Sequence, residues 1–569
     1  MWKKIENPKI GYTESNFSSD EIRKLEELNS NYITRSILNQ NGFTNDYMLK
    51  GLFRDERIDF DGQDRFHDLV KEALASRRVV IRNDYDVDGD TSGVILYKGL
   101  RRIADKLGSQ TEIILDQAER LWGYGTSLAV AQMIVEKYSP DFVITCDNGI
   151  KCKPAVDYLV ENGVRVLVTD HHLSEESMLP LKADIIINPH YNQILKFEDV
   201  CGAMVVFILI RRFFELEGWN SREDADFLEE MEELAAVATV ADVMPLIYCN
   251  RFLVKRLVEK ARKGDIKNLG LKVLIKTAGI KTETFNSDDV GFMICPMLNA
   301  PGRLGEAATA TNLLKATTEN EAEMYATKCI ELNKQRKDIC REANAKVVLD
   351  DSSVICSYIE DCPDGIIGII SGNITEKTGK PSFVFCKNED GLIKGSGRSP
   401  LNYNLIEGAD KVLAKHPELV KGYGGHAGAM GITLSGEWAI AEFQRLMCED
   451  YDSKDVEPMD TYYLDFFKDN DSIEKTFETV DMLSPYGEGL KAPVFRTFGL
   501  PLFIKDVGVD GSRFCISSKT GLNVNFVWFS GKAQGGFNAI YFSPVKEFFN
   551  GKYYYKGQVR EMGPYKKST

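Results

Sequence analysis

Four carboxylates stand within seven residues early in the chain, in the segment DYDVDGD that spans residues 84–90. The segment directly follows RRVVIR, a β-branched run that predicts a buried strand. Carboxylates packed this closely repel one another, so they are stable only in water or around a cation. The motif taken alone therefore leaves two interpretations open, an acidic surface turn and a cation site.

Three further acidic or histidine positions favour the cation site. Asp147 follows the apolar run DFVITC, His171 and His172 follow VRVLVT behind Asp170, and Asp242 interrupts the apolar segment AAVATVADVMPL. Parallel strands gather ligands at their carboxyl ends, so we expect these side chains to meet at one sheet edge. A buried carboxylate such as Asp242 needs a partner or a metal. Oxygen and nitrogen ligands without cysteine suit a pair of Mn²⁺ or Mg²⁺ ions, which serve phosphoryl chemistry.

Glycine-rich segments in the second half of the chain offer a different chemistry. The sequences DGIIGIISG, GSGRSP and GYGGHAGAMG are expected to form loops. GSGRS places Ser396 and Arg398 beside flexible backbone amides, and arginine is a planar bidentate donor for phosphate. The third segment holds His426, one of only six histidines. A plain turn and a structural loop histidine remain the alternatives.

The elements that must position these residues alternate between strand and helix from about residue 77. This alternation predicts βαβ units and a doubly wound parallel α/β sheet. The charged segment 319–349 lacks Gly and Pro and predicts one long, exposed connecting helix. We expect five regions: a helical extension at 1–76, the metal-binding domain at 77–318, the helix at 319–349, a second α/β domain at 350–455, and a C-terminal region at 456–569.

The end of the C-terminal region, at about 490–565, is aromatic and short-stranded, which predicts a small β-barrel similar to an oligonucleotide-binding (OB) fold. Stacking of bases on aromatic rings beside basic residues would hold a single strand. The interleaved basic residues are Lys505, Arg513, Lys532, Lys546, Lys552 and Lys556. The alternative is that most of the aromatic rings form the barrel core.

Composition limits the class of protein. The chain has 569 residues, 43% hydrophobic and 27% charged, which is typical of about three to four soluble globular domains. No apolar run is long enough for a membrane span, and the N-terminus does not resemble a secretory signal. Twelve cysteines without a C-x-x-C pair favour reduced thiols in a cytoplasm. The net charge of -15 decides little, because metal-binding acids and a basic groove can coexist.

Taken in order, DYDVDGDTS, VITCDNGI, VTDHHL and ATVADVMPL resemble the four motifs of the DHH phosphoesterase superfamily. Six more segments resemble its RecJ-like branch of single-strand-specific exonucleases: IINP, CGAMVVF, MLNAPGRLG, GLIKGSGRS, GYGGHAGAMG and SPYGEG. The resemblance runs from about residue 33 to the C-terminus. It implies a DHH domain at 77–318 and a DHH-associated domain at 350–455.

The resemblance also implies roles for individual residues. Five would hold two Mn²⁺ or Mg²⁺ ions, with Asp147 as the bridge: Asp86, Asp88, Asp147, His171 and Asp242. Four would be catalytic, with Asp84 at the first metal and His172 on the scissile phosphate: Asp84, His172, Arg303 and His426. Three would bind the 5′-terminal phosphate: Arg120, Ser396 and Arg398. Arg82 stands where many superfamily members have a metal-binding histidine.

The sequence thus predicts a metal-dependent exonuclease that degrades single-stranded DNA from 5′ to 3′ into mononucleotides, in DNA repair and recombination. Its partners would be single-stranded DNA and a single-stranded-DNA-binding protein or helicase, and it would be a cytoplasmic monomer without membrane contact. A short-oligonucleotide or cyclic-dinucleotide phosphodiesterase, or a pyrophosphatase, is the alternative that the region 490–565 disfavours. A non-enzymatic scaffold is disfavoured by the intact set of metal-ligand candidates.

Overall fold

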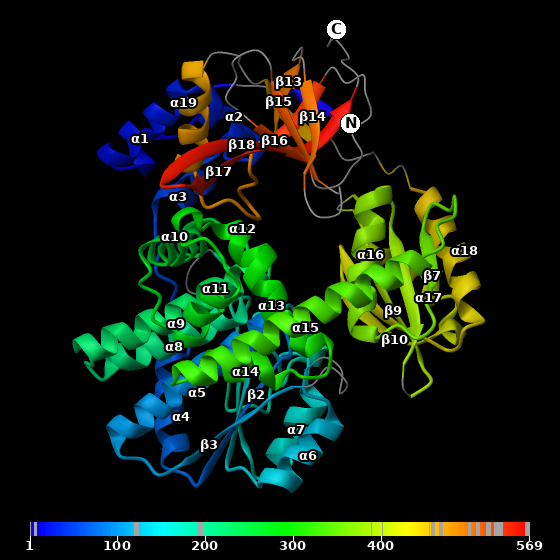
Figure 1. Ribbon diagram of the computed structural model, residues 1–569. Coiled ribbons are helices and arrows are strands. Elements are labelled where there is room, and N and C mark those ends of the chain that lie inside the picture. The colour runs from blue at the N-terminus through cyan, green and yellow to red at the C-terminus, as the bar shows by residue number, and fades with distance from the viewer. Residues whose placement is uncertain are drawn as a thin grey trace. The chain divides into compact units, whose positions relative to one another are not determined.

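The computed structural model describes residues 2–4, 8–118, 125–191, 197–388, 390–400, 402–454, 456, 461–465, 470–498, 502–507, 513–518, 525–528 and 539–563. The chain divides into two compact units (Figure 1). The large unit comprises 2–296, 310–327 and the described residues from 462 onward, and the small unit comprises 297–309 and 328–461. Within the described residues, no helix has the length and apolar character to cross a membrane.

The large unit contains a five-stranded parallel sheet, which confirms the predicted α/β architecture. Its strands, in spatial order, are β3 (Glu112–Asp116), β2 (Arg78–Asn83), β4 (Phe142–Cys146), β5 (Arg165–Thr169) and β6 (Ile185–Ile187). The chain runs from β2 to β3 on one side and then returns to β4 on the other side. This reversal opens a crevice at the carboxyl ends of the strands, where doubly wound sheets bind ligands.

Helices cover the sheet because its strands are apolar on both faces. Val80, Val143 and Val166 pack against one pair of helices, α6 (Leu128–Tyr138) and α7 (Lys153–Glu161), shown in cyan in Figure 1. Four other helices contact the strands or one another: α4 (Gln63–Leu74), α5 (Val87–Leu107), α8 (Gly202–Leu216) and α9 (Arg222–Ala241). Burial of such β-branched strands on both faces is typical of parallel sheets.

Further helices extend the large unit before and after this core. They are α1 (Ser19–Ser30), α2 (Tyr32–Gln40), α3 (Asp46–Phe53), α10 (Tyr248–Lys263), α11 (Leu269–Thr277), α12 (Ser287–Asp289) and α14 (Ala308–Lys315). A π-helix, 290–294, precedes α13 (Cys295–Arg303). The long helix α15 (Glu319–Lys346) forms as predicted, but it is not exposed all round, because Ala322, Ala326, Cys329 and Leu332 are buried.

The small unit contains a five-stranded mixed sheet. Its order is β10 (Val420–His426), β11 (Ala429–Leu434), β9 (Ile393–Arg398), β8 (Ser382–Lys387) and β7 (Ile355–Tyr358). The helices of this unit are α16 (Asp364–Thr378), α17 (Leu405–Leu413) and α18 (Ala439–Asp452). Phe383, Phe385 and Phe443 belong to the core that includes residues of α17 and α18, while Val384 and Cys386 share a core with residues of α16.

The prediction that the glycine-rich segments form loops is wrong for most of their length. DGIIGIISG opens α16, GSGR ends β9, and GYGGH and AMG lie in β10 and β11. The glycines of β9 are needed for packing: a Cβ on Gly395 or Gly397 would come within 2.4 Å of the Phe385 or Phe383 ring. Glycine marks close approach within a strand here, not a turn.

The C-terminal strands form one eight-stranded sheet that also takes up the N-terminal strand. Its order is β1 (Trp2–Lys4), β12 (Thr461–Asp465), β13 (Phe495–Phe498), β17 (Ala539–Phe549), β18 (Lys552–Gly563), β16 (Asn525–Trp528), β15 (Arg513–Ser518) and β14 (Leu502–Val507). Within the described residues β1 and β14 remain separate edges, so the predicted OB-like barrel is not confirmed. Pairing across the long strands β17 and β18 dominates this sheet instead.

This sheet region is joined to the parallel-sheet region within the large unit. Buried Arg251 of α10 donates hydrogen bonds to the carbonyls of Leu483 (2.9 Å), Ser484 (3.1 Å) and Pro485 (3.0 Å), which follow α19 (Asn470–Met482). The backbone N–H of Leu246 donates to the Glu488 carbonyl at 2.8 Å. A buried arginine that satisfies three backbone carbonyls is costly to remove, so this contact fixes the C-terminal region to the helices that follow the parallel sheet.

Candidate metal centre

The loop after β2 brings the first carboxylates to the edge of the parallel sheet. Asp86 caps α5, because its Oδ1 accepts a hydrogen bond from the Gly89 N–H at 3.0 Å. Glycine is required at that position, since a Cβ on Gly89 would lie 2.5 Å from the carbonyl of Asp84. The turn therefore folds the start of α5 directly over Asp84, which is itself buried.

Asp88 is held by the N-terminus of α8, far away in the sequence. Its two carboxylate oxygens accept hydrogen bonds from the N–H groups of Gly202 (2.7 Å) and Ala203 (2.8 Å). Free N–H groups and the helix dipole make a helix N-terminus favourable for a carboxylate. Gly202 also lets the helix approach, because a Cβ there would lie 2.7 Å from the Asp147 Cβ. The segment CGAMVVF is part of the family resemblance, but nothing in its sequence indicates that its backbone N–H groups bind Asp88.

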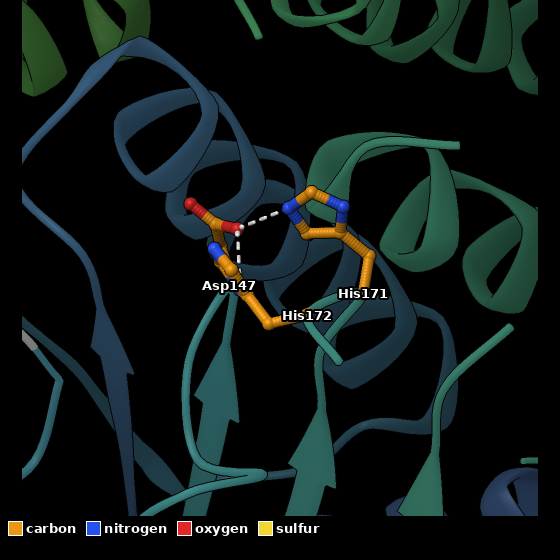
Figure 2. A group of neighbouring side chains, drawn as sticks. All are labelled: Asp147, His171 and His172. Atoms are coloured by element: carbon orange, nitrogen blue, oxygen red, sulfur yellow. Dashed lines mark ion pairs between the residues drawn. The ribbon is translucent and has the colours of Figure 1, made fainter. Parts of the chain in front are cut away.

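The strands β4 and β5 deliver the centre of the cluster, shown in Figure 2. The Nε2 atom of His171 lies 3.2 Å from Asp147 Oδ1. The same nitrogen lies 3.5 Å from both Asp88 Oδ2 and Asp242 Oδ2. Asp242 comes from the end of α9, where it is the C-cap residue. Four segments of the chain thus bring acids and a histidine to one point at the sheet edge.

The donor atoms form three overlapping groups, each within 4.8 Å. They are Asp84–Asp86–Asp147, Asp88–His171–Asp242 and Asp147–His171–His172. The structure therefore brings together every metal-ligand candidate that the sequence predicted, and Asp147 is common to two groups. His172, predicted to contact phosphate, is also within reach of a metal in the third group.

The charges of this cluster fit a cation. Three buried carboxylate oxygens, one each on Asp84, Asp147 and Asp242, have no hydrogen-bond partner. Burial, followed by the charge of Asp88, raises the pKa of Asp147 well above its usual value and that of Asp242 to about 8. Burial and Asp86 raise the pKa of Asp84 in the same way. Buried carboxylate oxygens without a hydrogen-bond donor from the protein are the kind of oxygen ligand that Mn²⁺ and Mg²⁺ prefer.

The two adjacent histidines differ in the direction in which their surroundings shift the pKa. Burial lowers the pKa of His171, which favours the neutral imidazole that a metal ligand must be. Burial acts in the same direction on His172, but its hydrogen bond to Asp170 and nearby acidic charges raise its pKa to about 9. Asp170 Oδ1 lies 2.7 Å from His172 Nδ1 and also accepts both histidine backbone N–H groups, while its Oδ2 accepts the Ile150 N–H. The sequence alone gives Asp170 no role, although it stands within the Asp-His-His motif itself.

Arg82 points its charge at a different partner. Its Nη1 donates to Asp116 Oδ2 at 2.7 Å, and both side chains are buried. The hydroxyl of Tyr138 donates to the other oxygen of Asp116 at 2.9 Å. Guanidinium cannot ligate a metal, so the residue that replaces the superfamily histidine instead ties the ends of β2 and β3 together.

The phosphate-binding candidates of the small unit lie on neighbouring strands. Ala429 of β11 pairs with Arg398 of β9 on one side and with His426 of β10 on the other. Directly paired residues face the same side of a sheet, so Arg398 and His426 share a face. Arg398 Nη1 donates to Ser396 Oγ at 3.1 Å. A Cβ on Gly368 of α16 would lie 3.0 Å from both Ser396 Oγ and Arg398 Nη2.

The remaining two site candidates have separate positions. Arg303, at the end of α13, donates from Nη1 to the Gly365 carbonyl at 3.0 Å and so is anchored to the start of α16 in the small unit. The metal-centre residues belong to the large unit, and Arg303, Ser396, Arg398 and His426 belong to the small unit. Arg120 lies outside the described residues.

Comparison with known families defines the class of this fold and site. Residues 78–239 match the N-terminal domain of the DHH family, and residues 351–451 match the DHHA1 domain. The first match contains the strands and helices that supply Asp84, Asp86, Asp88, Asp147 and His171, and it ends just before Asp242. The second match contains the strands that carry Ser396, Arg398 and His426. Fold and site together define a protein of the DHH family.

Individual relatives narrow the family. The single-stranded-DNA-specific exonuclease RecJ of Haemophilus influenzae is 31% identical over 449 residues, which are 75% of this chain and 76% of the relative. RecJ of Dickeya dadantii is 30% identical over 459 residues, with 75% and 76% covered. A crystal structure of Thermus thermophilus RecJ in complex with Mn²⁺ matches with a TM-score of 0.77 and 25% identity, covering 94% of this chain and 76% of that one. The chain belongs to the RecJ family.

Proposed function

We propose that this chain is a metal-dependent exonuclease that degrades single-stranded DNA from 5′ to 3′ and releases mononucleotides, in DNA repair and recombination. The observation that carries the proposal is the single point at which His171 meets Asp88, Asp147 and Asp242, with buried carboxylate oxygens that lack hydrogen bonds. The RecJ relatives named above and the Mn²⁺-bound RecJ structure support the substrate and the metal.

The metal ligands in this proposal are Asp86, Asp88, Asp147, His171 and Asp242, with Asp84 close by. Two bound Mn²⁺ or Mg²⁺ ions would supply an activated water and charge stabilisation for the leaving oxygen. Asp170 orients the His172 ring through Nδ1 and raises its pKa, and in its cationic form this ring would donate a hydrogen bond to the scissile phosphate. The α8 N-terminus fixes the Asp88 carboxylate, so this ligand needs little rearrangement to bind a metal ion.

The small unit would recognise the end of the strand. Arg398 and Ser396, together with Arg120, are proposed to bind the 5′-terminal phosphate, and Arg303 and His426 are proposed to act in catalysis. Arg398 and His426 lie on one face of the mixed sheet, which supports a shared anion-binding role. The five-region division proposed from the sequence, with the DHH domain at 77–318, separates the metal ligands from Ser396, Arg398 and His426 but leaves Arg303 with the metal ligands.

The C-terminal region is proposed to hold the strand through aromatic and basic residues. Phe495, Phe526 and Phe542 are buried, so these rings form core. Tyr553 and Tyr554 of β18 are exposed, and the Lys546 ammonium lies 4.7 Å from the Tyr553 ring centre. We further propose that the protein is a cytoplasmic monomer that meets a single-stranded-DNA-binding protein or a helicase on its substrate.

Digestion of 5′-labelled and 3′-labelled single strands with Mn²⁺ or Mg²⁺ tests the proposal. The 5′ label should appear at once as a mononucleotide, while the 3′-labelled strand should shorten gradually. The matched control is Asp147→Asn, which keeps the side-chain shape but removes the charge. Release from the 3′ end would contradict the polarity, and activity limited to dinucleotides or cyclic dinucleotides would favour the alternative phosphodiesterase.

The phosphate contact has its own variant. Arg398→Ala should weaken use of 5′-phosphorylated strands more than 5′-hydroxyl strands, by about 1.5–3 kcal/mol for a charged hydrogen bond. Lys394→Ala removes a cation from the same strand and serves as the control. Equal losses on both kinds of end would reassign Arg398 to general backbone contact.

A further inference from the structure

Exposed apolar residues directly follow two members of the metal centre in the sequence, and others lie beside the helix that ends there. Leu173 directly follows His172 and is 67% exposed, and Val243 directly follows Asp242 and is 63% exposed. Phe292 is 78% exposed, and its neighbour Met293 is also exposed. We call these four residues the apolar rim. Scattered exposed apolar residues are ordinary, but a cluster at a reactive site indicates a binding surface.

The backbone at Val243 is strained. Helix α9 ends at the Asp242 C-cap, and Val243 follows in the left-handed region with φ 55°. The Met244 N–H returns to the Thr239 carbonyl at 3.0 Å, which closes the type of helix end where glycine is strongly preferred. A β-branched residue at positive φ is an outlier. The fold alone would favour glycine here, and strain of this kind gathers at functional sites.

Phe292 is held at the same end of α9. It lies in the π-helix 290–294, a type of helix often found at functional sites. A Cβ on the preceding Gly291 would lie 3.4 Å from Val240 Cγ1, and Cys295 Sγ lies 3.8 Å from the Val237 carbonyl. The π-helix thus runs along the last turns of α9, immediately before Asp242. The segment after β5 meets the same end of α9, because His171 Nε2 lies 3.5 Å from Asp242 Oδ2, and Leu173 is the second residue after His171.

The chemistry of the rim selects its occupant. A phosphate gains nothing from apolar side chains beside a cluster of carboxylates. A nucleobase has two apolar faces, and stacking on a protein side chain requires that it be unpaired and unstacked. The sugar–phosphate linkage places a base within a few ångströms of every phosphate that reaches the metals. Base and apolar surface therefore fit each other where the strand enters the centre.

We propose that Leu173, Val243 and Phe292 bind the face of an unpaired nucleobase next to the scissile phosphate, and so position the strand and help to exclude duplex. The inference rests on the proposed exonuclease function and adds to it a set of specificity-determining residues. It gives a physical use to the strained, exposed Val243, which neither the metal site nor the fold requires.

The test combines enzyme variants with abasic strands. Phe292→Ala and Val243→Gly should each lower kcat/KM on intact single strands by about tenfold. Strands with one abasic nucleotide at position one, two or three from the 5′ end should be cut more slowly by the unmodified protein. At the position that the rim contacts, the variants should lose little further activity, because the base that they fail to bind is already gone. Leu181→Ala, at another exposed leucine (71%), is the matched control and should behave as the unmodified protein on every strand.

Thermal melting separates this role from a structural one. Val243→Gly relieves the positive-φ strain, so it should melt at the same or a higher temperature while losing activity. A lower melting temperature with equal losses on intact and abasic strands would overturn the inference and assign the rim to packing within the chain. Unchanged kcat/KM in both variants would overturn it as well. If the unmodified protein fails to digest intact single strands, the proposed function itself is wrong.

Discussion

Carboxylates in two regions of the large unit differ in whether a positively charged side chain pairs with them. Glu21 in α1 accepts two hydrogen bonds from the Arg54 guanidinium, at 2.8 and 3.0 Å, and a third from the Ser18 N–H. Asp84, Asp147 and Asp242 are grouped with other acids and with histidines, and each keeps an oxygen without a hydrogen bond. The fold supplies a cation at Glu21 and leaves the metal centre to obtain one from solution.

This difference is visible in the pKa values. The hydrogen bond from Arg54 lowers the pKa of Glu21 to about 2, whereas burial and Asp88 raise that of Asp242 to about 8. A protein tolerates such repulsion only where another function requires it, since burying unpaired charge costs stability. An uncompensated carboxylate cluster therefore identifies a cation site more securely than acidic composition does.

Among the changes that test this comparison, removing one central carboxylate charge should have the largest effect. Asp147→Asn should abolish nearly all exonuclease activity, because Asp147 is common to two groups of donor atoms. Asparagine tolerates the positive φ of 58° at this residue, so the backbone should keep its shape. Without metal, the variant should melt no lower than the unmodified protein, since one repelling charge is gone. Near-normal turnover by the folded variant would contradict the two-metal assignment.

Supplying the missing cation should have the next largest effect. Mn²⁺ at about 100 times its dissociation constant should stabilise the metal-free protein by about 2.7 kcal/mol, which is about 2–3 °C in melting temperature for a chain of this length. The Asp147→Asn variant should show little of this shift. A Mn²⁺-induced shift of equal size in both proteins would place the ion elsewhere.

Displacing the backbone that holds Asp88 in place should reduce metal affinity and activity less than removing a metal ligand. Gly202→Ala pushes a methyl group against Asp147 and displaces the N–H that holds Asp88. Changes to groups that orient metal ligands typically cost about 10–100-fold in affinity or activity. The control is Gly372→Ala, at a helical glycine with open space around its missing Cβ. The measurement is a Mn²⁺ titration followed by thermal shift. If Gly202→Ala bound Mn²⁺ as tightly as the control, the contact of Gly202 with the site would not matter for metal binding.

The sequence predicted the acidic edge because each signal was local. Asp84 and Asp147 directly follow apolar strands, and His171 follows another strand after Asp170. Parallel strands bring these ends together whatever the rest of the chain does. The role of Gly202 could not be found in this way. It depends on an approach between residues 114 positions apart, which no periodicity records.

The same reasoning explains the errors. Gly395 and Gly397 were assigned to a loop because glycine usually marks turns, but the rings of Phe385 and Phe383 occupy the space of their missing side chains. The barrel was inferred from strand length and aromatic content, which do not determine the order in which strands pair. β1, from the other end of the chain, joins that sheet, and its short sequence gave no sign of it.

Removing the paired carboxylate of Glu21 should have the smallest effect of these changes, and this effect is the reference for the others. Because the folded-state pKa of Glu21 is about 2, below the ordinary value of 4.5, its pairing stabilises the fold above about pH 4.5. That stabilisation should fade as the pH falls from about 4.5 to about 2, when the carboxylate becomes protonated in both states. Partly exposed pairs of this kind are worth about 0.2–1 kcal/mol. Glu21→Gln should therefore melt slightly below the unmodified protein at pH 6, and the difference should vanish near pH 2. Glu27→Gln, at an exposed position of the same helix, is the control, and its melting temperature should show no such pH-dependent difference. A difference for Glu21→Gln that persisted at pH 2 would show that the residue stabilises α1 through packing and not through its charge, and it could no longer serve as the compensated reference for the metal centre.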